Sequence, residues 1–168
     1  EEEKMFKIDY KKLLLNSIIT LVIFLIDRVT KFYILKIVET ESLVDIYINP
    51  YLNFYLIWNK GIAFGLLSFN KNLIYDFLTL VIFVISIIII SLIIKTNGLK
   101  RYALIFVLGG AFGNLYDRVY YSAVPDFIDF HIGGIHWFVF NVADIFITLG
   151  VICLILVELF DKKKHETN

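Results

Sequence analysis

Hydrophobic residues fall into four long runs along the chain, roughly at 13–34, 73–94, 102–119 and 142–160. Each run is long enough to cross the hydrocarbon core of a bilayer, about 30 Å thick, as an α-helix. The first run is too long for the core of a signal peptide and has no small-residue cleavage site behind it, so we interpret it as a retained helix. The pattern therefore predicts an all-α membrane bundle of four transmembrane helices.

The connection between the first two runs differs from a simple loop. The stretch "VDIYINPYLNFYLIWN", at 44–59, contains two β-type runs on either side of Asn49 and Pro50. This pattern predicts a small hairpin or sheet. Aromatic side chains suit the membrane interface, where a ring sits in lipid while its polar edge stays hydrated, and contact with a substrate is an equal alternative. The aromatic residues concerned are Tyr47, Tyr51, Phe54, Tyr55 and Trp58.

Composition supports the membrane interpretation, because 59% of the 168 residues are hydrophobic. No linker rich in Gly, Ser or Pro divides the sequence, so we predict one domain over 1–168. The formal net charge is zero, which gives no overall attraction for a nucleic acid, and we expect no such partner. Cys153 is the only cysteine, so it forms no internal disulfide and is expected to pack as a small hydrophobic residue.

The positions of lysine and arginine predict the orientation in the membrane. Three basic clusters flank the hydrophobic runs and are expected on the cytoplasmic side. The two remaining connections hold few basic residues and are expected to face outward. This arrangement places both termini in the cytoplasm and "VPDFIDF", at 124–130, near the outer surface. The clusters comprise Lys4, Lys7, Lys11 and Lys12, then Lys95, Lys100 and Arg101, then Lys162, Lys163 and Lys164.

Three carboxylates lie at a similar depth on different predicted helices. Asp27, Asp117 and Asp144 each lie about 15 to 17 residues from the cytoplasmic end of their run, or about 22–26 Å at a rise of about 1.5 Å per residue. Ionisable groups at this depth are costly unless they face the bundle interior and find partners. We therefore regard these three residues as candidates for a functional site.

Some of these groups suit a structural role. Asp27 and Lys31 are spaced i, i+4 with the acid first, which favours an ion pair on one helix face. Asp117 precedes Arg118 and follows Asn114 by one turn. Asp117 either neutralises Arg118 or ties its helix to another, and the planar guanidinium of Arg118 can hold a carboxylate or a backbone carbonyl.

Asp126 and Asp144 differ from the other acids because neither has a basic neighbour in the sequence. Taken separately, Asp144 could be a carboxylate stabilised at a helix N-terminus, and Asp126 an ordinary loop residue. Taken together, two adjacent carboxylates resist double ionisation, share a proton and can act as general base and general acid on a water molecule. Such aspartyl hydrolysis needs no metal and no covalent intermediate, so we predict no cofactor.

Other chemistry finds less support in the sequence. His131 and His136 lie near Asp126 and Asp129, but the spacing matches no familiar ligand motif, so we expect solvated interface histidines and no metal. The stretch "GGAFG", at 109–113, lies inside a predicted span. Small residues there favour close helix packing rather than a phosphate-binding loop.

Five motifs occur in order over nearly the whole chain. They are "DRVTK" at 27–31, "NKGIAFG" at 59–65, "GGAFGNLYDR" at 109–118, "VPDF" at 124–127 and "FNVAD" at 140–144. Together they resemble the lipoprotein signal peptidases, the type II signal peptidases of bacteria. The resemblance implies four spans with an outward β-rich segment between the first two, in the cytoplasmic membrane. It implies an intramembrane aspartyl endopeptidase that removes the signal peptide of a prolipoprotein just before a cysteine carrying diacylglycerol.

The resemblance also implies roles for individual residues. Asp126 and Asp144 match the catalytic pair, Asp117 is a rival for the first position, and Asp27 with Lys31 matches a structural pair. The implied partners are the lipidated prolipoprotein and membrane lipid, and inhibition by globomycin-type cyclic peptides is expected. The residues expected to orient the substrate or to support the pair are Asn59, Gly61, Asn114, Asp117, Arg118 and Asn141.

Two positions depart from the family pattern. Arg28 stands where glutamine is common, and Phe138 stands where a proline usually precedes the "FN" pair. These two departures leave open the charge balance on the first span and the conformation of the chain leading into Asp144. Two other classes remain alternatives, a small transporter that relays cations through the buried acids and a noncatalytic scaffold. The sequence lacks the internal repeat of many transporters and any polar stripe through its second run.

Overall fold

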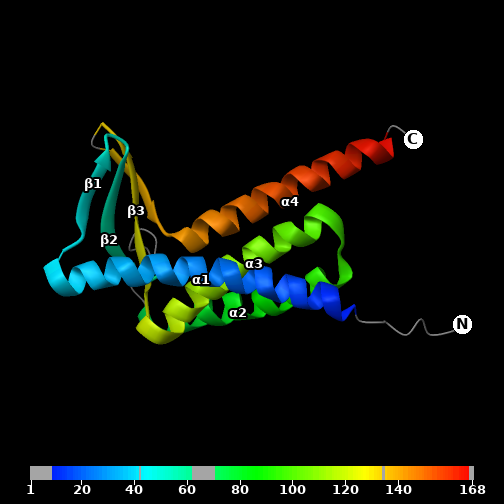
Figure 1. The fold of residues 1–168 in the computed structure, drawn as a ribbon, viewed down its shortest axis with the longest axis horizontal. Helices are drawn as coiled ribbons and strands as arrows, with labels where there is room; N and C mark the ends of the chain where they lie inside the picture. The colour runs from blue at the N-terminus through cyan, green and yellow to red at the C-terminus, as the bar shows by residue number, and fades with distance from the viewer. Residues whose placement is uncertain (1–8, 42, 62–70, 134, 167–168) are drawn as a thin grey trace, which may run out of the picture.

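Four helices and a four-stranded sheet make up the described part of the protein (Figure 1). The computed structural model describes residues 9–41, 43–61, 71–133 and 135–166. The sheet lies at one end of the helices, and the first turn of α1 and the last turns of α4 lie toward the other end (Figure 1). The helices are α1 (Tyr10–Glu41), α2 (Lys71–Lys95), α3 (Gly98–Tyr121) and α4 (Val142–Glu166).

The structure confirms the four predicted helices and extends each of them at one or both ends. Among the described residues, three helices are long and apolar enough to cross a membrane: α1, the Tyr75–Lys95 part of α2, and the Val142–Asp161 part of α4. The chain is therefore a multi-pass membrane protein. The polar ends of α1 were missed because hydropathy reports lipid contact and not helix length. Its first turn is capped by Asp9, whose Oδ1 accepts the backbone N–H groups of Lys11 and Lys12.

The remaining helix, α3, lies at the centre of the bundle and packs against α1, α2 and α4. Its glycines permit this close approach. A Cβ atom on Gly109 would lie 2.7 Å from the Cβ of Ile23 on α1, and one on Gly110 would overlap the backbone carbonyl of Ala143 on α4. Small residues let helices approach at backbone distance in a membrane, so the interpretation of "GGAFG" as a packing motif is confirmed.

The sheet is antiparallel, with strand order β1-β2-β3-β4. Strands β1 (Asp45–Asn49) and β2 (Leu52–Asn59) confirm the β-rich segment predicted between the first two helices. Strands β3 (Val124–Ile132) and β4 (Ile135–Phe140) were not predicted, and the interpretation of this stretch as a loop is wrong. The signal was present, because Gly133 begins a Gly-Gly pair between two apolar runs, a pattern typical of a hairpin.

A small hydrophobic cluster attaches the sheet to the helices. Ile34 of α1, Val44 and Phe127 of β3 are buried in it, and Phe54 and Val142 pack against them. Because Val142 begins α4, this cluster fixes the position of β3 relative to the first turn of α4. The sheet thus holds one candidate catalytic strand beside one candidate catalytic helix.

Candidate active site

Asp126 lies on β3 and is 4% exposed. Both of its carboxylate oxygens accept hydrogen bonds from asparagine amides. Asn141 Nδ2 donates to Oδ1 at 2.6 Å, and Asn59 Nδ2, from the end of β2, donates to Oδ2 at 2.9 Å. The carboxylate is therefore held in a fixed orientation by residues from two different elements.

Asp144 lies in the first turn of α4, three residues after the cap residue Asn141. The Oδ1 atom of Asn141 accepts the backbone N–H of Asp144 at 3.2 Å, and the Oδ2 atom of Asp144 accepts the backbone N–H of Asn141 at 3.1 Å. This reciprocal pair is a capping box. It satisfies free N–H groups at the start of α4 and fixes the Asp144 side chain at the same time.

Asn141 links the two aspartates, since its side chain contacts Asp126 while its backbone contacts Asp144. The second oxygen of Asp144, Oδ1, accepts a hydrogen bond of 2.7 Å from Nδ2 of Asn114 on α3. Asp144 is half-buried, so one side of the pair remains accessible. The arrangement brings two carboxylates together from a strand and a helix.

Each of the three asparagines has its amide orientation fixed by a second partner. Asn59 Oδ1 accepts the N–H of Gly61 at 2.7 Å, and Asn114 Oδ1 accepts Lys31 Nζ at 3.1 Å. Asn141 Oδ1 is occupied by the Asp144 N–H. Because the oxygen of each amide already has a donor, its NH₂ group faces a carboxylate.

Burial raises the pKa of the Asp126 carboxyl group, and the negative charge of Asp144 raises it further. The hydrogen bonds from Asn141 and Asn59 and the positive charge of Lys31 oppose this rise in pKa without cancelling it. Asp126 therefore keeps its proton to a higher pH than an exposed aspartate does. This behaviour suits the acid member of an acid–base pair.

A buried ionic network on α1 and α3 lies beside Asp126 and Asp144 and is linked to the start of α4. Lys31 Nζ lies 3.0 Å from Asp27 Oδ1 and 2.6 Å from Asp117 Oδ2. Arg28 donates to Asp117 at 2.5 and 2.8 Å and to Asp27 at 2.6 Å. Asp27 Oδ1 also accepts the backbone N–H of Ala143, at 3.0 Å, in the first turn of α4. The network thus joins three helices beside the candidate catalytic residues.

Asp117 forms ion pairs with two cations of another helix, Arg28 and Lys31, and so ties α3 to α1. Among the described residues it forms no ion pair with Arg118. Within the described residues, the Arg118 guanidinium donates only to the Asn114 carbonyl of its own helix, at 3.2 Å, and its buried Nε atom has no partner. Arg118 therefore has donors left for another molecule.

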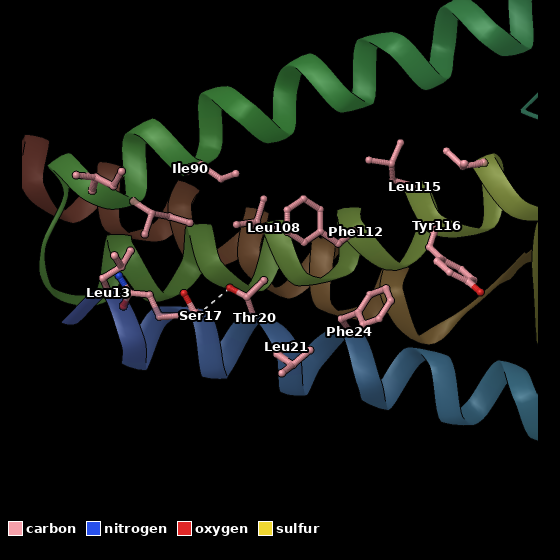
Figure 2. Close-up of a pocket in the computed structure, with 14 residues that line it drawn as sticks. Leu13, Ser17, Thr20, Leu21, Phe24, Ile90, Leu108, Phe112, Leu115 and Tyr116 are labelled. Atoms are coloured by element: carbon pink, nitrogen blue, oxygen red, sulfur yellow. Dashed lines mark hydrogen bonds between the residues drawn. The ribbon is translucent and has the colours of Figure 1, made fainter. Parts of the chain in front are cut away.

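Two hollows lie along the helices near this site. One, of about 620 Å³, runs between α1, α2 and α3 and is lined almost entirely by apolar side chains (Figure 2). Figure 2 shows Phe24 and Tyr116 at one end of it and Leu13 at the other. The second, of about 740 Å³, is lined by Arg28 and Lys31 together with aromatic residues such as Trp58. Both offer apolar surface, and the second combines it with charged side chains.

A family model described as signal peptidase (SPase) II matches residues 19–160. The chain belongs to the signal peptidase II family. The chain is 58% identical over 166 residues to the lipoprotein signal peptidase of Pelagibacter ubique (strain HTCC1062), covering 98% of this chain and 100% of that protein. It is 39% identical over 163 residues to that of Anaplasma phagocytophilum (strain HZ), covering 94% and 99%. The resemblance inferred from the five motifs is thereby confirmed.

Two solved structures described as a bacterial membrane enzyme share the fold of this signal peptidase II family member. One, at 1.9 Å resolution, has a TM-score of 0.72 and 31% identity and covers 86% of this chain and 92% of its own. The other, at 2.3 Å, has a TM-score of 0.67 and 30% identity and covers 89% and 90%. Both were obtained by the in meso method, which agrees with an integral membrane protein.

Most residues that the sequence predicted for the site lie together in this member of the signal peptidase II family, but the sequence missed two features. Arg28 was noted only as a departure from the family pattern, although it makes more ionic contacts than Lys31 does with Asp117. The cross-strand environment of Asp126 was missed together with β3. Gly61, with φ of +75°, closes a turn on Asn59, while the rest of "NKGIAFG" after Gly61 lies outside the described residues.

Proposed function

We propose that this chain is an aspartyl endopeptidase that cleaves the signal peptide from prolipoproteins, with Asp126 and Asp144 as the catalytic pair. Membership of the signal peptidase II family gives the reaction class. The observation that carries the assignment of residues is Asn141, which contacts both carboxylates. A single residue bridging two acids keeps them in one geometry for action on the same water molecule.

The two carboxyl groups divide the roles of acid and base. Asp144 takes a proton from a water molecule, whose oxygen attacks the carbonyl carbon of the scissile peptide bond. Asp126, whose pKa is raised by burial, donates its proton to the carbonyl oxygen. When the tetrahedral intermediate collapses, the C–N bond breaks and the leaving nitrogen receives the proton held by Asp144. One hydroxyl of the intermediate returns a proton to Asp126 as the new carboxyl group forms. General acid–base catalysis of this kind contributes about 10²–10⁴-fold to the rate.

Asp117 is excluded from the catalytic pair in this proposal because Arg28 and Lys31 occupy its oxygens. Its role is structural, together with Asp27. Asn59 and Asn114 orient the two catalytic carboxylates. The remaining donors of Arg118 suit a backbone carbonyl of the substrate, and Gly61 fixes the turn that holds the Asn59 amide.

The substrate we propose is a prolipoprotein whose cysteine carries diacylglycerol, cleaved just before that cysteine. Its acyl chains stay in the bilayer or enter the apolar hollow between α1, α2 and α3 (Figure 2). The sheet and the start of α4 then face the outer side of the cytoplasmic membrane, with both chain termini in the cytoplasm. Globomycin-type cyclic peptides are expected to occupy the same site and inhibit it.

The decisive experiment is cleavage of a diacylglyceryl-modified prolipoprotein by purified protein in detergent. Asp126→Asn and Asp144→Asn are expected to abolish cleavage while the thermal unfolding midpoint stays near that of the unmutated protein. Asp117→Asn is expected to lower the midpoint and to retain cleavage. Normal cleavage by Asp126→Asn would refute the proposed pair. If the folded unmutated protein cleaved nothing, a transport or scaffold role would replace the peptidase, and ion flux in sealed vesicles would distinguish those two.

The same experiment addresses our proposal that residues 1–168 form a single peptidase domain. The sheet and the helices share a hydrophobic cluster and the catalytic pair. Two separable parts would unfold in two transitions, whereas one domain loses cleavage and helical structure together.

A further inference from the structure

The structure also brings together a second group of polar residues, on the sheet and separate from the catalytic pair. It consists of Asp129 on β3, His131 on the same strand and His136 on β4, whose donor atoms all lie within 4.8 Å of one another. His131 and His136 are direct cross-strand partners. The sequence spacing matched no familiar ligand motif, because the hairpin, and not the spacing, makes these residues neighbours.

Both histidines direct their Nδ1 atoms at the same carboxylate oxygen. Asp129 Oδ2 lies 2.7 Å from Nδ1 of His136 and 3.6 Å from Nδ1 of His131. The closer pair is a hydrogen bond that needs a proton between the two atoms. The 3.6 Å separation is too long for a hydrogen bond, and His131 Nδ1 is buried with no partner among the described residues.

Asp129 is 1% exposed, and its other oxygen, Oδ1, also has no hydrogen-bond partner in the described part of the chain. A buried carboxylate oxygen without a partner is costly and calls for an explanation, such as an ion. Asp129 and His136 line a hollow of about 440 Å³ together with Asp45 and Asn53. The Oδ1 atom of Asn53 is buried and unpartnered as well. The cluster therefore has unused acceptors around an accessible space.

We propose that Asp129, His131 and His136 bind a divalent transition-metal cation of the zinc type. Two imidazoles and one carboxylate form the donor set that zinc, copper and nickel prefer, whereas calcium and magnesium prefer oxygen donors throughout. In a tetrahedral site with zinc bonds of about 2.0–2.2 Å, the ligand atoms lie roughly 3.3–3.6 Å apart. Nδ1 of His136, now 2.7 Å from Asp129 Oδ2, must therefore move away from that oxygen by a modest amount. His136 is 60% exposed on its side chain and lies beside the hairpin turn, so it has the freedom to make this adjustment.

Binding places the cation where the hydrogen-bonding proton lay. That proton moves from Nδ1 to Nε2 of His136, which stays a neutral imidazole, and the freed Nδ1 and the carboxylate oxygen become ligands together with Nδ1 of His131. The fourth position is open to water or to the carboxylate of Asp45, which lines the same hollow. The metal would join β3 to β4 and so stabilise the hairpin that carries Asp126. This site does not depend on the proposed catalytic chemistry.

The test is isothermal titration of ZnCl₂ into tag-free protein that has been stripped with EDTA in detergent. We expect one bound zinc per chain and no uptake of MgCl₂. His131→Ala and His136→Ala should weaken zinc binding at least about tenfold, the smallest effect typical of changes around a metal. His165→Ala is the matched control, because His165 is the remaining histidine of the chain and is placed at the far end of α4.

Thermal unfolding provides a second measurement that is independent of activity. Zinc should raise the unfolding midpoint of the unmutated protein and of His165→Ala, and should leave that of His136→Ala unchanged. The exposed position of His136 makes this variant the one expected to fold normally. The proposal is overturned if the folded protein takes up no zinc, if His136→Ala binds as tightly as the unmutated protein, or if His165→Ala abolishes binding.

Discussion

The guanidinium of Arg28 on α1 donates two hydrogen bonds, of 2.5 and 2.8 Å, to the carboxylate of Asp117 on α3. This is a bidentate arrangement, which is the strongest geometry available to an arginine–carboxylate pair. With Lys31 and Asp27, it gives a network of two positive and two negative groups. A buried network with balanced charge avoids an uncompensated ion, whose burial would be far more costly.

Removal of the Arg28 charge should therefore destabilise the protein. Arg28→Met leaves two buried carboxylates facing one lysine, and loss of one partner from a buried ion pair costs about 3–5 kcal/mol. Arg28→Gln, which restores the residue common in the family, should cost less because the amide still donates to Asp117. The measurement is the thermal unfolding midpoint in detergent.

The control for the Arg28 variants is Lys100→Ala. Lys100 forms a 2.8 Å ion pair with Glu158, but both side chains are largely exposed, at 43% and 71%. Exposed ion pairs contribute little to stability because solvent screens them, so the midpoint should hardly change. Equal losses for Arg28→Met and Lys100→Ala would contradict the importance we assign to the buried network.

Asn141 offers a way to separate the stability of α4 from catalysis. Asn141→Ser retains a capping oxygen for the start of α4 but loses the amide that donates to Asp126. The unfolding midpoint should stay close to that of the unmutated protein, while kcat for prolipoprotein cleavage should fall about 100-fold because Asp126 loses its orientation relative to Asp144. Asn141→Ala should lower both quantities. A serine variant with normal kcat would show that the bridge between the aspartates is dispensable.

The helices of this protein were predictable because the signal for each is local. Long apolar runs determine membrane helices, and the capping box at the start of α4 is visible in the spacing of Asn141 and Asp144. The partners of Asp117 were not predictable, because they depend on which face of α3 meets α1. A sequence shows that Arg118 is adjacent, yet adjacent residues on a helix point in different directions.

The same reasoning explains the missed second half of the sheet. Strand β3 is buried along one part of its length and carries Asp126 and Asp129, so it shows no clean alternation of apolar and polar residues. Its partner β2 lies far away in the sequence, and a pairing of this kind leaves no local trace. The grouping of His131 with His136 was missed because the hairpin of β3 and β4 was not predicted.

The pH dependence of cleavage should respond to the Asn59 amide. The hydrogen bond from Asn59 favours the ionised form of Asp126 and so lowers its pKa, against the dominant effect of burial. Removal of this donor in Asn59→Ala raises the pKa of Asp126 further. Because Asp126 must be protonated to act as the acid, activity should persist to higher pH. The alkaline limb of the kcat/KM profile should therefore shift to higher pH. A shift to lower pH would reverse our assignment of acid and base.

Gly110 tests whether the contact between α3 and α4 positions the catalytic pair. A methyl group in Gly110→Ala would overlap the backbone carbonyl of Ala143 and lie 2.8 Å from Cγ1 of Ile147. Since Ala143 precedes Asp144, the first turn of α4 must move away from α3, and the 2.7 Å hydrogen bond between Asn114 and Asp144 should lengthen.

Overpacking of this kind costs about 1–3 kcal/mol. We expect a lower unfolding midpoint and at least about tenfold slower cleavage, because small misplacements of catalytic groups reduce rates strongly. Leu99→Ala, which shortens an exposed side chain of the same helix, should change neither quantity. Unchanged cleavage by Gly110→Ala would mean that Asp144 is positioned by its capping box alone.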